Sequence, residues 1–395
     1  MKRITLDKIT NLILFMYIIS LYLFTYVEGL FVISNALALL FVLMVFIKIL
    51  SNKKIIFNKY LRYHFLFIFI CLGSFFYAMS QGNVISEVRT LVLTFIVMVA
   101  LANHVDTTDK INWVIKSFII SGLVASIYII FISDFTHAIR FGSELGNVND
   151  IGMIIGISSI FSINEYFRFN KKSYLIILIP MVIVILLTGS RKSLLFIFIA
   201  TLFILYWKNR NSLKGKIKFI FIGFIILVVS FYVITEVPFL YNIIGKRIEG
   251  LIALLTGEGR ADTSTITRKH MIEFGFELFK KRPFLGYGSK NYQVIYGLVH
   301  EMDRYAHNNF IELLVNVGLI GTLTYYISNF KIVKDLYKHS KRFNNNELGN
   351  LFIAIILTYF LTGISMVYYD NKHYSFLLAV ASIIPSVYSK EKENQ

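Results

Sequence analysis

Residues 174–207 decide the fold, and they read YLIILIPMVIVILLTGSRKSLLFIFIATLFILYW. As a single helix at ~1.5 Å per residue this stretch would be about 50 Å long, whereas the hydrocarbon core of a bilayer is about 30 Å thick. Gly189, Ser190 and Arg191 interrupt the apolar run near its middle. The stretch therefore predicts two membrane helices joined by a turn at these three residues.

The rest of the chain has the same character. Of its 395 residues, 56% are hydrophobic and only 16% are charged. The apolar runs are continuous and do not alternate with polar residues, so the spans should be helices rather than strands of a barrel. We expect an all-α integral membrane protein with about twelve spans, at residues 9–27, 30–50, 63–79, 90–105, 113–132, 147–164, 174–188, 193–207, 219–235, 309–330, 350–368 and 374–388.

The basic residues predict the orientation of these spans. Short loops rich in Lys and Arg stay in the cytoplasm. Basic clusters precede the first predicted span and follow the second, sixth, eighth and tenth, and they all fall on one side only if 174–207 crosses twice. Both termini are then cytoplasmic. We therefore attribute the net charge of +17 mainly to basic cytoplasmic loops, and we do not expect a surface that binds nucleic acid.

This topology divides the chain into three parts. Residues 1–235 hold nine spans, residues 236–308 form one large extracytoplasmic loop, and residues 309–395 hold three more spans and a short cytoplasmic tail, which we expect to be disordered from Lys390. Within the loop, the apolar spacing from Thr265 to Lys281 predicts an amphipathic helix, which Pro283 ends. We expect one or two such helices to lie over the outer ends of the bundle.

A polar cluster directly precedes the tenth predicted span. Ala306-His307-Asn308-Asn309 leads into an apolar helix from residue 310 to residue 326. Asn308 or Asn309 can cap this helix, whose N-terminal amides favour a nearby anion. Glu312 lies one turn before Asn316, and it can orient His307 or pair with an arginine. Polar groups at a membrane surface in this pattern suggest a reaction site.

Four motifs in this order resemble the bacterial O-antigen ligases and the related polysaccharide polymerases. They are His307-Asn308-x9-Gly318-x2-Gly321, Arg268 followed by Pro283-Phe284-Leu285-Gly286-Tyr287-Gly288, Thr188-Gly189-Ser190-Arg191, and Asn147-Val148-Asn149-Asp150. The chain departs from the family at Val148, where many members have proline, and at Ile272, where an aromatic residue is frequent. The resemblance covers the whole predicted topology, including the large outer loop.

The resemblance implies a glycosyltransferase that acts on the outer face of the bacterial cytoplasmic membrane. Such enzymes move a glycan from an undecaprenyl diphosphate donor to an acceptor hydroxyl. The sequence has no Asp-x-Asp pair to bind a nucleotide sugar through a metal, so we expect a transfer without a metal or a cofactor. The resemblance implies His307 as the base and Arg191 and Arg268 as clamps on the diphosphate, which suits the bidentate hydrogen bonding of arginine. The residues expected to bind substrate are Asn308, Asn309, Glu312, Ser190 and Asn149. A flippase and a chain-length regulator of the same pathway are the expected protein partners.

Several alternatives stay open. We favour a polymerase, because the Ile-, Lys-, Asn- and Phe-rich composition suggests an AT-rich genome, common for capsule loci. A ligase uses the same donor with another acceptor, and a transporter of the same lipid-linked glycan is a third reading. His307 can be a plain interfacial residue or cap, Arg191 a snorkelling residue and Arg268 part of a solvated face. The other loop residues that can replace Arg268 in this scheme are His270, His300, Arg260 and Arg304.

Overall fold

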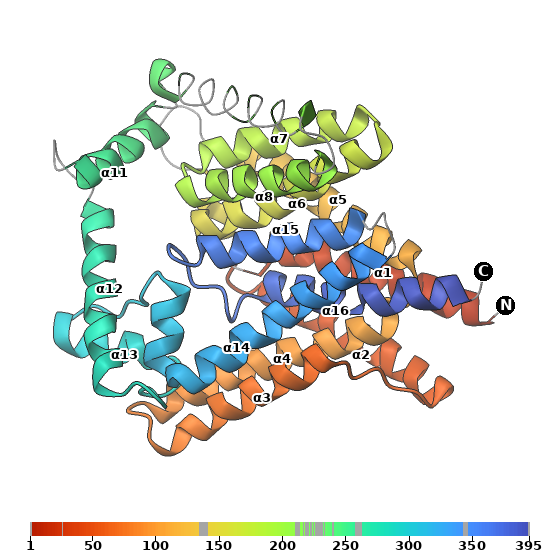
Figure 1. Cartoon of the computed structure of the whole chain (residues 1–395), viewed down its shortest axis with the longest axis horizontal. Helices are drawn as coiled ribbons and strands as arrows, with labels where there is room; N and C mark the ends of the chain where they lie inside the picture. Colours follow the sequence, from red (N-terminus) through yellow and green to blue (C-terminus); the bar gives the residue numbers. More distant parts are fainter. Residues whose placement is uncertain are drawn as a thin grey trace. The chain divides into compact units, whose positions relative to one another are not determined.

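The computed structural model describes residues 2–25, 27–133, 141–209, scattered positions between 214 and 238, 241–256, 263–342 and 347–393. All the regular elements in these ranges are helical, as predicted (Figure 1). The longer ones are α1 (Lys2–Leu23), α2 (Phe31–Asn52), α3 (Lys59–Gly73), α4 (Gln81–His104), α5 (Thr108–Ile132), α6 (Val148–Phe169), α7 (Ser173–Leu187), α8 (Arg191–Asn209), α11 (Lys246–Thr256), α12 (Thr263–Lys281), α13 (Tyr292–His300), α14 (Asn309–Arg342), α15 (Glu347–Thr362) and α16 (Lys372–Glu393).

Five of the described helices are long and apolar enough to cross a membrane. They cover Leu6–Leu23, Phe31–Ser51, Gln81–His104, Thr108–Ile132 and Asn309–Lys341. Two shorter apolar helices, α7 and α15, also fall on predicted spans. The ninth predicted span, 219–235, lies mostly outside the described residues. The described part of the chain is therefore all-helical, with five helices able to span a membrane, and the number of twelve spans stays a prediction.

Several boundaries differ from those predicted. Helix α4 begins at Gln81, nine residues before the predicted span, and α14 continues beyond residue 330 to Arg342. Helix α16 runs to Glu393, so the disorder expected from Lys390 onward is wrong for residues 390–393, and the last two positions lie outside the described residues. The predicted loop segment 236–308 carries α11, α12 and α13, and α12 matches the helix expected from Thr265 to Lys281.

The chain forms two compact units. The first comprises Met1–Phe41 and Asp109–Asp262, and the second comprises Val42–Thr108 and Thr263–Gln395. The first unit is built around α6, whose residues are mostly buried. Helices α7 and α8 pack beside α6 (Figure 1). A Cβ atom at Gly122 of α5 would overlap Ser158 of α6, so these two helices touch through small residues, as is common inside membranes.

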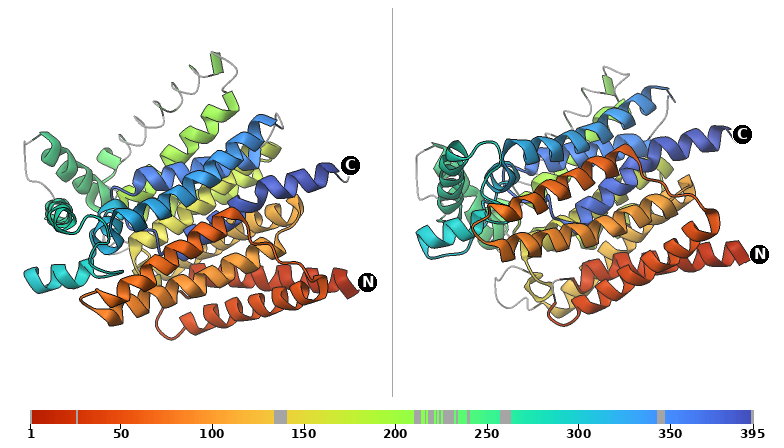
Figure 2. Two further views of the ribbon diagram at one scale, coloured as in Figure 1. Left: turned by 60° about the horizontal axis from the view of Figure 1, so that its bottom comes forward. Right: turned by 90° about the horizontal axis from the view of Figure 1, so that it is seen from below.

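The second unit contains the helices on which most of the predicted site residues lie. Helix α14 packs along α3, α3 packs along α4, and α16 packs along α4 (Figure 2). Helices α12 and α13 lie against the first turns of α14 and share a small hydrophobic core with it, made by Met271, Leu278, Tyr292, Tyr296, Ala306, Ile311 and Val315. This core positions the segment before α14, where His307 lies.

Candidate active site

The start of α14 is held by two asparagine side chains. Asn308 Oδ1 accepts hydrogen bonds from the backbone N–H groups of Phe310 and Ile311 at 2.9 and 3.1 Å, so Asn308 is the N-cap. Asn309 Oδ1 accepts from the N–H groups of residues 368 and 369 at 2.9 and 3.0 Å, and its Nδ2 donates to the Tyr326 hydroxyl at 2.8 Å. Both side chains are thus engaged inside the protein, and their contact with substrate remains a prediction.

His307 lies in the turn immediately before these caps. Its φ of 52° is in the left-handed region, which non-glycine residues seldom adopt. Glu312, which is 3% exposed, fixes this turn: its Oε2 accepts a hydrogen bond from the N–H of Ala306 at 2.7 Å, and its Oε1 accepts from Asn316 Nδ2 at 3.0 Å. Glu312 therefore positions the His307 turn through the main chain of the preceding residue.

Arg268 lies on the face of α12 that packs toward the core. Met271, Gly275 and Leu278 follow it at intervals of three, four and three residues, which places all four on one side of the helix. A Cβ atom at Gly275 would overlap Ile311 of α14, so this side of α12 approaches α14 closely. Arg268 is half-buried, whereas its neighbour Lys269 is exposed. This placement argues against the reading of Arg268 as part of a freely solvated face.

Helix α14 is broken at Gly318. The residue has φ 62° and ψ −167°, a conformation available essentially only to glycine. The loop of residues 283–288 inserts its backbone at the break. Its hydrogen bonds are Tyr287 N to Val315 O at 2.8 Å, Gly288 N to Asn316 O at 2.8 Å, Leu319 N to Pro283 O at 2.8 Å and Ile320 N to Phe284 O at 3.3 Å. The glycine-containing motif at residues 283–288 thus contacts the one at Gly318. The backbone groups that lose their helical partners at the break in α14 form hydrogen bonds with the loop instead.

A charged cluster that the sequence reading missed follows this loop. Lys290 has φ 57°, and its Nζ lies 3.6 Å from Oε2 of Glu87, which is 1% exposed. The Asn291 side chain anchors the segment, because it accepts from Ser80 N at 2.7 Å and donates to Ser80 O at 3.2 Å. The sequence alone could have pointed to this cluster through Glu87, because an acidic residue in the first turns of an apolar helix is usually functional.

Asp370 belongs to the same charged region. It lies in the connection between α15 and α16, next to the residues whose N–H groups bind Asn309. Burial raises the pKa of the Asp370 carboxyl, and the positive charge of Lys290 opposes that rise. A carboxyl group in such surroundings is a candidate for proton chemistry or for binding a polar substrate.

The turn at Gly189 confirms the predicted hairpin in the first unit. Helix α7 ends at Leu187, Gly189 has φ 58°, and α8 begins at Arg191. Ser190 is 1% exposed, and its Oγ accepts a hydrogen bond from Ser193 Oγ at 2.9 Å. A Cβ atom at Gly152 of α6 would lie 2.5 Å from Ser193 Oγ, so the turn packs on α6 just after its N-terminus.

The predicted site residues are divided between the two units. Asn149, Ser190 and Arg191 belong to the first unit, and Arg268, His307, Asn308, Asn309 and Glu312 belong to the second. In the second unit, one small core joins the helix of Arg268 to the residue before His307. Among the residues that the structure describes, no group of three His, Cys, Asp or Glu side chains is arranged to hold a metal ion.

Helices of membrane-spanning length and a polar turn ahead of α14 define a helical membrane protein with a candidate reaction site. Residues 176–326 match the model of the O-antigen ligase family. The matched stretch begins in α7 and ends in α14, and it contains Arg191, Arg268 and His307. This stretch therefore carries the O-antigen ligase domain, in agreement with the family that the motifs predicted. A comparison with curated proteins found no match.

Proposed function

We propose that this protein is a polysaccharide polymerase that joins undecaprenyl-diphosphate-linked oligosaccharide repeats on the outer face of the cytoplasmic membrane. The acceptor hydroxyl oxygen forms a bond to the anomeric carbon of the donor sugar. The bond from that carbon to the diphosphate oxygen breaks, and undecaprenyl diphosphate leaves with the electron pair. His307 takes the hydroxyl proton, and the configuration at the anomeric carbon inverts.

The geometry of the His307 turn carries this proposal. A histidine with left-handed backbone is kept in place by Glu312 and by the Asn308 cap, both buried at the start of α14. Backbone strain of this kind costs ~1–3 kcal/mol and persists where the surroundings hold it, most often at functional sites. A base must be held within hydrogen-bond reach of the proton it removes. The turn supplies such a fixed position.

The arginines supply the positive charge that a departing diphosphate requires. Arg268 projects from the inner face of α12, and Arg191 begins α8, where the positive end of the helix dipole also favours an anion. The planar guanidinium can donate two hydrogen bonds to one phosphate. Lys290, close to the loop that closes the α14 break, adds a further cation in the unit of His307.

The topology belongs to the same proposal. With about twelve spans and cytoplasmic termini, the segment 236–308 and the start of α14 face the outside, where lipid-linked repeats are polymerised. Residues 170–172, between α6 and α7, then face the cytoplasm. Chain-length regulation and delivery of the repeat fall to other proteins of the pathway.

A ligase is the second candidate, because the matched family model carries that description. The two activities differ in the acceptor, which is a growing chain in one case and a lipid A-core or another acceptor in the other. A transporter is disfavoured by the break in α14. Transporters leave the backbone of a broken helix open to bind substrate or ions, whereas here the loop of residues 283–288 occupies the break.

The test of His307 uses purified protein in detergent with the lipid-linked repeat as the only glycan. The wild type should build long chains that resolve as a ladder on a gel, which a ligase without its acceptor would not do. His307→Ala should reduce chain growth ~10²–10⁴-fold. Lys269→Ala, which replaces an exposed side chain on α12, serves as the control and should keep wild-type activity. Normal ladders from a well-folded His307→Ala protein would remove this residue from the mechanism.

The test of Arg268 separates charge from geometry. Arg268→Lys should be impaired, because lysine keeps the charge but loses the bidentate hydrogen bonding, and Arg268→Ala should be worse. Lys269→Ala removes a neighbouring charge whose side chain is 65% exposed, and it should leave chain growth unchanged. Arg191→Lys and Arg191→Ala are compared in the same way. Equal activity of Arg268→Ala and Lys269→Ala would show that Arg268 is a surface residue.

A further inference from the structure

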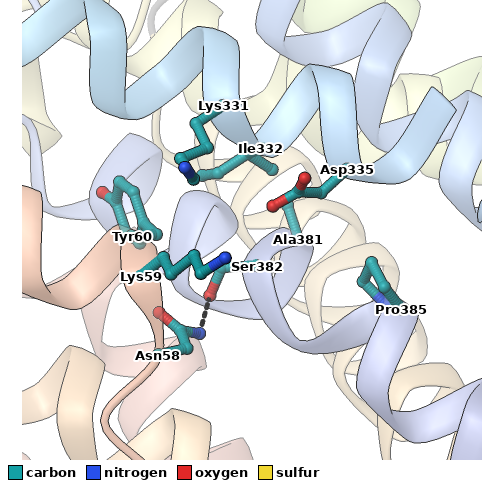
Figure 3. Close-up of a pocket in the computed structure, with 9 residues that line it drawn as sticks. All are labelled: Asn58, Lys59, Tyr60, Lys331, Ile332, Asp335, Ala381, Ser382 and Pro385. Carbon is teal, nitrogen blue, oxygen red and sulfur yellow. Dashed lines mark hydrogen bonds between the residues drawn. The ribbon is translucent and has the colours of Figure 1, made fainter. Parts of the chain in front are cut away.

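A cleft lies beside the C-terminal third of α14, far along the helix from His307. Its volume is about 270 Å³, and it is bordered by the start of α3, the later turns of α14 and the middle of α16 (Figure 3). Asn309 and Lys331 both lie on α14, and at ~1.5 Å per residue they are roughly 30 Å apart along the helix. This is about the thickness of the hydrocarbon core. If His307 lies at one membrane surface, the cleft lies at the other.

Two lysines give the cleft an excess of positive charge. Lys59 and Lys331 line it together with one acidic residue, Asp335 (Figure 3). Among the described residues, neither lysine forms an ion pair with a carboxylate. Lys331 Nζ lies 5.5 Å from the centre of the Tyr63 ring, which supports the side chain without neutralising its charge. The arrangement suits an anion that bridges the two ammonium groups.

Neutral polar groups complete the lining. Asn58 Nδ2 donates to Ser382 Oγ at 2.8 Å, and Asn58 Oδ1 accepts from the N–H of Leu61 at 3.0 Å, so the rim is tied to both α3 and α16. Asn58 is the N-cap of α3, whose first N–H groups therefore lie at the cleft. Backbone N–H groups at a helix start donate readily to phosphate. They add to the attraction of the two lysines.

The surface next to the cleft is apolar. Leu323, Ile327 and Phe330 of α14 are 50%, 50% and 42% exposed, and their spacing places them on one face in the turns that lead to Lys331. A charged cleft at the end of such a face matches a lipid, whose phosphate enters the cleft while its acyl chain follows the helix. The volume is below the roughly 300–1,000 Å³ of pockets that take a whole drug-sized ligand, and it suits a headgroup.

We propose that this cleft binds the phosphate of an anionic phospholipid, such as phosphatidylglycerol, in the cytoplasmic leaflet. Basic pockets between membrane helices on the cytoplasmic side have the chemistry to hold anionic headgroups. The density of lysines in the predicted cytoplasmic loops on either side, Lys53 and Lys54 before α3 and Lys334 and Lys338 on α14, places the cleft at that surface.

The experiment measures phosphatidylglycerol binding by native mass spectrometry of the delipidated full-length protein. Lys59→Gln/Lys331→Gln should weaken binding roughly tenfold to thirtyfold, the effect of removing two lysines that face a phosphate. The matched control, Lys54→Gln/Lys334→Gln, loses the same charge at exposed residues that do not line the cleft. It should bind as the wild type does, and both variants should keep the melting temperature of the wild type in phosphatidylcholine.

Two outcomes would overturn the proposal. Equal loss of affinity in both variants would mean that diffuse surface charge attracts the lipid and that the cleft has no special role. Competition by inorganic phosphate or glycerol 3-phosphate at low millimolar concentration, with weak retention of the lipid, would identify a soluble phosphate compound as the ligand. Binding is measured without any glycan, so the result is independent of the polymerase proposal.

Discussion

Replacement of Gly318 by alanine should disrupt the junction between α14 and the loop of residues 283–288. A Cβ atom at Gly318 would overlap the carbonyl group of Phe284 and lie 2.6 Å from the nitrogen of Leu285, and these are backbone atoms that cannot rotate away. Holding a non-glycine residue in this conformation costs ~1–3 kcal/mol. Loss of the four hydrogen bonds would cost about 2–6 kcal/mol more, at ~0.5–1.5 kcal/mol each.

The assay can use the chain's only cysteine. Cys71 is fully buried in α3, so a dye that fluoresces on reaction with thiols reports when heating exposes it. Gly318→Ala should lower the melting temperature by several degrees, and hydrogen exchange should speed up in the peptide that holds the N–H groups of Tyr287 and Gly288. Gly82→Ala is the matched control, since a Cβ there meets no atom within 4 Å, and alanine favours the helix by up to ~1 kcal/mol. Unchanged melting and exchange in Gly318→Ala would refute the described junction.

The remaining predictions concern the site and the topology. Glu312→Ala should abolish chain growth and destabilise the protein by ~1–3 kcal/mol, because it leaves the N–H of Ala306 buried without its acceptor. If the variant kept its activity, the hydrogen bond from Ala306 to Glu312 would not be needed for catalysis. Asp370→Asn should raise the melting temperature by an amount that grows as the pH rises above the ordinary pKa of an aspartic acid. Burial raises the pKa of Asp370 in the folded protein, so the wild type loses stability as this carboxyl ionises; a difference independent of pH would contradict the buried charge. In a Cys71→Ala background, Met302→Cys should react with an impermeant maleimide in intact cells and Lys171→Cys only after permeabilisation; the reverse pattern would invert the topology.

The hairpin and the helix cap were predictable because both depend on neighbouring residues. The length of the apolar run in 174–207 cannot fit one span, so a turn at Gly189 follows from the thickness of a bilayer. Asn308 lies two and three residues before the N–H groups it caps. The contact between Glu312 and Asn316 is likewise set by one turn of helix.

The break at Gly318 and the pair of Lys290 with Glu87 could not be predicted in this way. The left-handed backbone of Gly318 is stabilised by hydrogen bonds to a loop some thirty residues earlier, and an apolar sequence with a glycine reads equally well as an unbroken helix. Lys290 reaches Glu87 from a distant part of the chain. The predicted span began at residue 90, which left Glu87 outside the membrane helix and removed the one local signal of its role.

The loop of residues 283–288, which closes the α14 break, is held in place by its backbone. Its position therefore does not depend on which side chains it carries. The bonds to α14 use only main-chain N–H and C=O groups, while the side chains of Phe284 and Leu285 are 65% and 52% exposed. During evolution these two residues can be exchanged for others that suit a different glycan or lipid without moving the helix segment that follows His307. The glycines must stay, so sequence variation among relatives should concentrate at the positions between them.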